Sequence, residues 1–304
     1  MTEIFLPVCD YDLSATLDSG QVFRWVRSPD SPTSWTGMVG KNFVQLTQQP
    51  DGILAQTAAP QGNWDWLREF LQTEVDLEKI LKTFPDDEPM RAAVAACHGL
   101  RLLRQEPWEC LASFILSSTK QIVQIRQIVA LLCERFGERL AAERVAADMS
   151  PLKLSGGDIG AGSRRLLPAS FPTSEKIAGL TEAELRACKM GFRAPNLLNA
   201  ARQIAGGKLD LEKIRRLDHA AARAELMTLR GVGGKIADCV LLFAYGFDAA
   251  FPVDMWVERA LQRLYFPRRR ARAQRLRRFA ATHFGPHAGY AQQYLFHYMR
   301  TKSK

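Results

Sequence analysis

The sequence predicts an α+β protein in which a small antiparallel β-sheet domain is followed by a larger, all-helical region. Short alternating segments separated by turn residues fill the first part of the chain, a helical period replaces them from about Trp64, and no internal repeat is visible. We expect the sheet domain to cover residues 1–80 and the helical domain residues 81–304, with the boundary between Thr73 and Asp87.

Four short segments of the first part carry strand signals, because β-branched and aromatic residues in them partly alternate with polar ones. The expected strands are Gln21–Val26, Ser34–Val39, Phe43–Thr47 and Ile53–Thr57. Prolines, glycines and an asparagine separate the segments, as tight turns require. Strands so short and so closely spaced predict an antiparallel sheet.

Apolar residues recur at helical spacing through most of the remaining chain. The expected helices are Trp64–Leu71, Leu77–Thr83, Glu88–Cys97, Pro107–Ser117, Gln121–Phe136, Thr181–Cys188, Asn196–Ala205, His219–Thr228 and Met255–Leu264. Residues 149–172 are rich in glycine and proline instead, and we expect a long loop or insertion there.

The composition is that of a globular chain with an excess of positive charge. Of 304 residues, 47% are hydrophobic, and 41 Lys and Arg against 32 Asp and Glu leave a net charge of +9. This balance favours an anionic partner such as DNA, although an ordinary basic enzyme can share it. No signal peptide and no apolar run of about 20 residues is present, so we expect no membrane contact. We expect a soluble monomer, cytoplasmic and nucleoid-associated in a bacterium or nuclear in a eukaryote.

The cysteines do not form a metal-binding pattern. They are Cys9, Cys97, Cys110, Cys133, Cys188 and Cys239. None form a C-x-x-C pair, and no zinc or iron–sulfur spacing occurs. We expect mostly buried, reduced thiols, no metal and no cofactor.

The most informative segment is Leu229–Cys239, which reads L-R-G-V-G-G-K-I-A-D-C and lies between a predicted helix and the apolar run Val240–Tyr245. Gly231 and Gly233 allow a tight turn between two helices and let a phosphate approach the backbone, while Val232 fits between the helices. The free N–H groups of the second helix would bind that phosphate without reading sequence. A glycine-rich turn without a ligand is the alternative for the G-x-G alone, but the wider pattern favours a DNA-binding hairpin.

Lys235 and Asp254 are the candidate catalytic pair. Lys235 lies in the first turn of the second hairpin helix, where the helix dipole and partial burial both favour the neutral, nucleophilic amine. Such an amine can attack an electrophilic carbon and form a Schiff base. Asp254 precedes the helix Met255–Leu264 as a natural N-cap, and its carboxylate can stabilise developing positive charge or assist proton transfer. A phosphate-binding lysine and a purely structural cap are the alternatives.

These motifs resemble the helix-hairpin-helix glycosylase superfamily, and several segments resemble the 8-oxoguanine DNA glycosylases in particular. The segments are Ser19–Trp25, Leu102–Leu111, Phe114–Ser118, Gly191–Ala194, Leu229–Cys239, Pro252–Asp254 and Gly289–Gln292 with Phe296. The resemblance runs from about residue 10 to residue 300. It implies a base-excision-repair glycosylase and AP lyase that removes oxidised purines from double-stranded DNA without a cofactor, and it leaves activity on formamidopyrimidine lesions open.

The resemblance assigns base recognition to four positions. The glycine matching Gly20 accepts a hydrogen bond from N7–H of 8-oxoguanine, a hydrogen that guanine lacks. Gln292 matches the glutamine that binds the Watson–Crick edge, and Cys239 and Phe296 match residues that sandwich the base. From the residues alone, Gly20 is equally an ordinary turn glycine, Cys239 and Phe296 are equally core residues, and Gln292 is equally a solvated helix residue.

The resemblance also implies DNA contacts, and the chain departs from the family at several of them. The implied positions are Gly231, Val232, Gly233, Thr119, Gln124, Phe192, Arg193, Met255 and Trp256. Thr119 stands in place of an asparagine, Gln124 of an arginine, Phe192 of a tyrosine wedge and Trp256 of a phosphate-binding histidine. Selectivity for cytosine opposite the lesion is therefore not implied.

An arginine cluster follows the predicted helix Met255–Leu264. Its members are Arg268, Arg269, Arg270, Arg272, Arg275, Arg277 and Arg278. It is either a phosphate-binding patch or a solvated helix face.

Three other functions compete with this interpretation. Alkylpurine glycosylases keep the aspartate but lack the lysine, and pyrimidine enzymes similar to endonuclease III keep the lysine but usually carry a C-terminal cysteine cluster. A non-catalytic helix-hairpin-helix module explains Gly231–Lys235 and the charge. It does not explain Asp254, Gly20 or Gln292.

Overall fold

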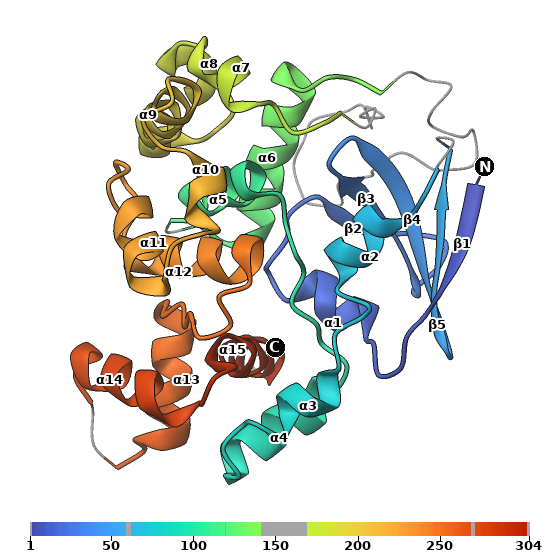
Figure 1. The fold of residues 1–304 in the computed structure, drawn as a ribbon, viewed down its shortest axis with the longest axis vertical. Coiled ribbons are helices and arrows are strands. Elements are labelled where there is room, and N and C mark those ends of the chain that lie inside the picture. The colour runs from blue at the N-terminus through green and yellow to red at the C-terminus, as the bar shows by residue number, and fades with distance from the viewer. Residues whose placement is uncertain (1, 59–61, 119, 141–168, 269–270, 303–304) are drawn as a thin grey trace.

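The N-terminal part forms an antiparallel sheet, as predicted. The structure, a computed structural model, describes residues 2–58, 62–118, 120–140, 169–268 and 271–302. Five strands, β1 (Thr2–Pro7), β2 (Trp25–Arg27), β3 (Ser34–Val39), β4 (Asn42–Gln49) and β5 (Gly52–Thr57), pair in the order β1-β5-β4-β3-β2 (Figure 1). The expected strands at 34–39, 43–47 and 53–57 are confirmed.

The expected strand Gln21–Val26 is wrong over most of its length, because β2 begins only near its end. At Gln21, hydrogen bonds of the buried side chain take the place of the backbone hydrogen bonds that a strand would make. Its Nε2 donates to the carbonyls of Thr16 at 3.0 Å and Arg101 at 2.8 Å, and its Oε1 accepts from the backbone N–H of Leu103 at 2.8 Å. These bonds fasten the preceding turn to the chain that leads into the helical region.

β1 was not predicted from the sequence. It pairs with β5 at the edge of the sheet, and Leu6 is its only buried residue. A strand that buries so little lacks the alternating apolar pattern by which strands are recognised.

The structure contains every helix that the sequence predicts. The helices are α1 (Leu13–Asp18), α2 (Asp65–Leu71), α3 (Leu77–Leu81), α4 (Glu88–Ala96), α5 (Pro107–Leu116), α6 (Ile122–Phe136), α7 (Ser174–Ala178), α8 (Glu182–Arg186), α9 (Ala194–Ala205), α10 (Leu211–Ile214), α11 (His219–Leu226), α12 (Gly234–Val240), α13 (Met255–Tyr265), α14 (Ala273–His283) and α15 (Ala288–Lys302). A 3-10 turn, η2 (Gly191–Arg193), precedes α9, and a π-helix, η3 (Leu241–Tyr245), continues α12. Residues 149–168 of the expected loop lie outside the described residues.

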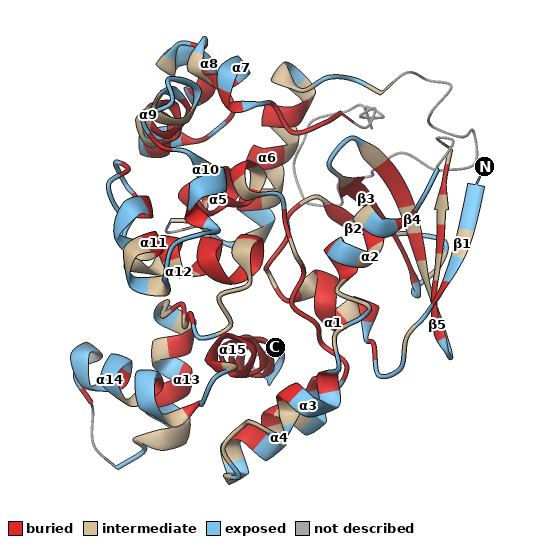
Figure 2. Cartoon of the chain, viewed as in Figure 1, coloured by how far each residue is buried: buried red, intermediate tan, exposed pale blue. Residues whose placement is uncertain are grey.

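The helix α15 was missed because it has no polar face. Figure 2 shows it as buried along most of its length. The buried residues include Gln292, Gln293 and His297, so polar side chains here do not mark a solvent side. The amphipathic period that identifies a surface helix is therefore absent.

Two buried clusters organise these elements. One lies between the sheet and α2 and includes Leu103, and the other joins the helices and takes in Phe23 and α15. No helix in the described part of the chain is long and apolar enough to cross a membrane.

We expect Gln21→Ala to lower the free energy of unfolding by about 3 kcal/mol, because each buried partner left without its hydrogen bond costs ~1–3 kcal/mol. Urea denaturation followed by circular dichroism measures the change. The matched control is Gln274→Ala on the exposed surface of α14, which should stay within about 0.5 kcal/mol of the wild type. Equal losses in the two variants would contradict the structural role of Gln21.

Candidate functional site

The predicted hairpin joins α11 to α12. Gly231 has a φ of +82°, and a Cβ built on it would lie 2.3 Å from Nδ2 of Asn196, so a glycine is required there. Gly233 has an extended backbone with φ −97°, which any residue adopts, and a Cβ there would meet nothing within 4 Å. The expected need for a glycine is therefore confirmed at position 231. At position 233 neither the backbone conformation nor the space around the Cα requires one. Val232 is buried, as expected.

Lys235 is the second residue of α12 and is half-buried against α5. Its Nζ lies 3.4 Å from Oγ of Ser117 and 5.2 Å from the centroid of the Phe114 ring. The Ser117 hydroxyl donates to the carbonyl of Phe114 at 2.7 Å, so its oxygen is left to accept from the amine. The amine thus has a hydroxyl and a ring face as neighbours.

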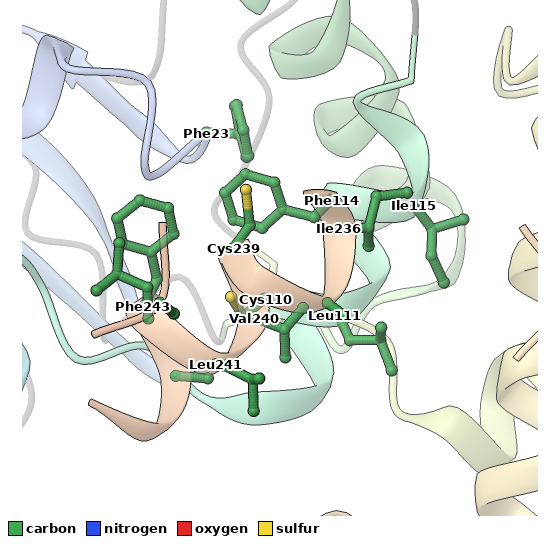
Figure 3. Close-up of a cluster of buried hydrophobic side chains, with 14 of the residues drawn as sticks. Phe23, Cys110, Leu111, Phe114, Ile115, Ile236, Cys239, Val240, Leu241 and Phe243 are labelled. Atoms are coloured by element: carbon green, nitrogen blue, oxygen red, sulfur yellow. The ribbon is translucent and has the colours of Figure 1, made fainter. Parts of the chain in front are cut away.

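Aromatic packing fixes the ring beneath this amine. Phe23 meets Phe114 edge-on at 5.7 Å, and Phe243 stacks on Phe114 at 5.5 Å. Figure 3 shows these side chains in the buried cluster around α5 and α12. Phe23 comes from the N-terminal part and Phe243 from η3. The position of the amine therefore depends on both parts of the chain.

Cys239 links the two candidate catalytic residues. The pKa of its thiol is raised to about 12, mainly by burial; Lys235 opposes this rise, and the charge of Asp254 contributes to it. The thiol is consequently neutral at physiological pH. The charges of Lys235 and Asp254 both act on this one buried group, as does the charge of Asp238. Although both side chains are described, they form no ion pair with each other.

Asp254 caps α13, as expected. Its Oδ1 accepts from the backbone N–H of Val257 at 2.8 Å, and the residue is half-buried. Since capping uses only one carboxylate oxygen, the other remains available for chemistry.

The structure brings Gly20 next to the C-terminal helix. Gly20 has a φ of +85°, and a Cβ built on it would lie 2.7 Å from Cδ1 of Ile122 and 3.5 Å from Cε1 of Phe296. Nε2 of Gln293 donates to the carbonyl of Ser19 at 3.0 Å. Hydrogen bonding thus holds the turn around Gly20 against α15, where Phe296 and Gln292 lie.

Gln292 is buried, so its interpretation as a solvated residue is wrong. Its Oε1 has no hydrogen-bond partner in the described part of the chain. A buried amide oxygen without a donor costs free energy, which a bound N–H group would recover.

The candidate wedge residue Phe192 is 60% exposed, whereas Arg193 is 2% exposed. The Arg193 guanidinium lies 4.2 Å from the centre of the Phe192 ring and donates to the carbonyls of Ser118 and Met190. Arg193 is therefore placed to support Phe192 rather than to reach DNA itself.

The remaining residues predicted to contact DNA differ in how far they are exposed. Gln124 is exposed and accepts from the backbone N–H of Gln121 at the start of α6. Met255 is 61% exposed, and Trp256 is half-buried with the Arg259 guanidinium 5.6 Å from its ring. Thr119 lies outside the described residues.

Sequence reasoning missed the supporting residues. Ser117 and Phe114 were inside a segment singled out for its resemblance, but only the packing shows that they contact the amine. Gln293 gave no signal, because it is a polar residue whose burial depends on the position of α15.

Two cavities lie near these elements. A cavity of about 310 Å³ lies between the sheet and the start of α5 and is bordered by Phe23. A groove of about 1240 Å³ borders α13, α14 and α15 and is lined by Met255 and Trp256. Neither of the two is lined by Lys235 or Asp254. Within the described residues, no group of three or more His, Cys, Asp or Glu could hold a metal.

Family comparisons cover most of the chain. Residues 3–111 match the N-terminal domain of 8-oxoguanine DNA glycosylase, and residues 112–285 match the HhH-GPD superfamily of base excision DNA repair proteins.

Individual relatives agree with these matches. A probable N-glycosylase/DNA lyase of Methanothermobacter thermautotrophicus is 28% identical, with 97% of this chain and 95% of that protein covered. An N-glycosylase/DNA lyase of Saccharomyces cerevisiae is 32% identical, with 83% and 68% covered. The 8-oxoguanine glycosylase/lyase of Clostridium acetobutylicum, solved with double-stranded DNA containing cytosine opposite 8-oxoguanine, has a TM-score of 0.84 and 28% identity, with 99% of each chain covered.

We expect Gly231→Ala to destabilise the protein by about 1–2 kcal/mol or more, because the left-handed backbone is strained by a side chain and Asn196 blocks the Cβ. Gly233→Ala is the matched control and should change the free energy of unfolding by less than about 0.5 kcal/mol. Thermal and urea denaturation of both variants measure the difference. A larger loss at Gly233 would show that the hairpin geometry is misassigned.

Proposed function

The chain belongs to the N-glycosylase/DNA lyase family of HhH-GPD base excision repair proteins, and we propose that Lys235 and Asp254 carry out its chemistry. The protein is a DNA glycosylase that removes 8-oxoguanine from DNA and cleaves the strand as a lyase. The observation that carries the assignment of residues is geometric: the Lys235 amine lies over the Phe114 ring and 3.4 Å from Oγ of Ser117, and Asp254 uses one carboxylate oxygen to cap α13.

In the proposed reaction, the deprotonated Nζ of Lys235 forms a bond to C1′ of the everted nucleotide. The bond from C1′ to the base breaks, and the base leaves with a proton. Opening of the sugar ring then gives the Schiff base, and loss of a C2′ proton breaks the C3′–O3′ bond of the strand. Lys235 and Asp254, both of which are described, form no ion pair with each other, so no salt bridge has to break before the amine reaches C1′.

The proposed role of Asp254 follows from its second carboxylate oxygen. While one oxygen caps α13, the other can stabilise positive charge that develops on the sugar, or move the proton. A carboxylate held by its own helix needs no reorganisation during the reaction.

Base recognition is proposed for Gly20, Gln292, Cys239 and Phe296. The proximity of Gly20 to Phe296 and the unpartnered Oε1 of Gln292 support a purine held between α15 and the Gly20 turn. Because Cys239 and Gln292 are buried, we expect neighbouring side chains to shift as the base enters.

We propose that the hairpin residues Gly231, Val232 and Gly233 hold a backbone phosphate. The exposed Phe192 is the proposed wedge, with Arg193 as its support, and Met255, Trp256 and Gln124 are proposed contacts. Thr119 stays a proposal from the sequence alone.

The proposed unit of function is one chain, since residues for catalysis and recognition come together without a partner subunit. It would act in the compartment that holds the DNA and away from membranes. The division at residue 80 also stays a proposal. Every buried residue of the sheet cluster except Leu103 precedes residue 80, and this distribution supports the proposed division.

Replacing Lys235 by glutamine should abolish covalent trapping by borohydride on a duplex that contains 8-oxoguanine, because glutamine cannot form the Schiff base. Gel electrophoresis of the trapped complex measures the result. The exposed Lys208→Gln variant is the control and should trap as the wild type does. An adduct in the Lys235→Gln variant would exclude this lysine as the nucleophile.

Asp254→Asn should slow single-turnover release of 8-oxoguanine by about 100-fold or more, because asparagine still caps α13 but carries no charge. Unfolding temperature should change little. Asp76→Asn provides the comparison, since Asp76 caps α3 through the backbone N–H of Lys79 and lies outside the site. If Asp254→Asn excised at the wild-type rate, Asp254 would be only a cap.

A further inference from the structure

The groove of about 1240 Å³ adjoins the candidate site and is not explained by the chemistry above. Met255 and Trp256 line it and directly follow Asp254 in the chain. Its walls are α13 and α14, with Met299 from α15. Figure 1 shows these three helices together beneath α12, and Figure 2 shows α14 as largely exposed.

The groove carries an excess of positive charge. Arg259, Arg263 and Arg272 line it and are exposed, and Glu258 is the one acidic residue that lines it. In the described part of the chain, none of these three arginines forms an ion pair. Arginines that no carboxylate neutralises favour a polyanion in the space between them.

The arginines are arranged along the groove rather than at one point. Arg259 and Arg263 are one helical turn apart on α13, and Arg272 stands at the start of α14 on the other wall. The lining also includes Leu276 and Met299, which are buried and apolar. Positive charges that flank an apolar surface match a chain of phosphates joined by deoxyribose rings.

We propose that this groove, lined by Trp256, Arg259, Arg263, Arg272, Leu276 and Met299, holds the sugar–phosphate backbone of the damaged strand beside the everted nucleotide. This inference rests on the proposed function. Asp254 faces the sugar of that nucleotide, so the next phosphates of the same strand pass Met255 and enter the groove. An acidic protein segment would match the charge, but it lacks this continuity with the active site.

The salt dependence of DNA binding tests the proposal. The double variant Arg263→Gln/Arg272→Gln is compared with Arg135→Gln/Arg216→Gln, which removes the same charge at exposed positions outside the groove. Affinity for a duplex with an uncleavable abasic analogue is measured from low to high salt. Each lost phosphate contact lowers the slope of log affinity against log salt by about 0.9, so we expect a drop of up to about 1.8 and roughly tenfold or greater weakening near 0.1 M salt. The control should keep the wild-type slope.

Neutral methylphosphonate linkages identify the strand. Placed one at a time, they should weaken wild-type binding next to the lesion in the damaged strand and have a smaller effect on the groove variant. An unchanged salt slope in the groove variant, the result expected if the groove serves an acidic protein, would overturn the proposal. So would an effect confined to the complementary strand.

Borohydride trapping separates this inference from the proposed function. At saturating enzyme, the groove variant should still form the covalent adduct, because Lys235 is unchanged. Failure of the wild type to form the adduct would reject the proposed chemistry. It would leave the strand assignment to be judged by the salt and methylphosphonate results.

Discussion

The buried contact between α5 and α12 sets the position of the Lys235 amine. α12 is short and continues into a π-helix, so its orientation depends on the side chains beneath it. Phe114 lies under the amine, and Phe23 and Phe243 hold Phe114 in place. A lysine has a long, flexible side chain, and such packing restricts it to one region before any substrate arrives.

The residues proposed for base recognition reach this region from opposite ends of the chain. Gly20 comes from the N-terminal part, and Gln292 and Phe296 come from the last helix. The hydrogen bond from Gln293 to Ser19 joins the two, and Gln21 fastens the same turn to Arg101 and Leu103. Neither part of the chain contains the complete candidate site. A disturbance of either part would therefore act on both base recognition and excision.

The charges inside the candidate site differ from those on the surface beside it. Inside the site, the thiol of Cys239 is neutral, and Lys235 and Asp254 do not form an ion pair with each other. Outside it, exposed arginines line the groove along α13 and α14. Positive charge is thus kept at the surface that would meet phosphates, where water solvates it until DNA binds.

The sequence by itself determined the fold class, most of the helices, the hairpin and the cap at Asp254. These features depend on local rules: hydrophobic periodicity, the conformation of Gly231, and the preference of an aspartate for a helix start. Tertiary structure alone decided the contacts of Lys235 with Ser117 and Phe114, the burial of Arg193 beneath Phe192, and the place of α15 in the core. Those contacts join residues far apart in the chain. A polar residue such as Gln292 or Gln293 has no local property that distinguishes a buried position from a solvated one, so only packing could place it.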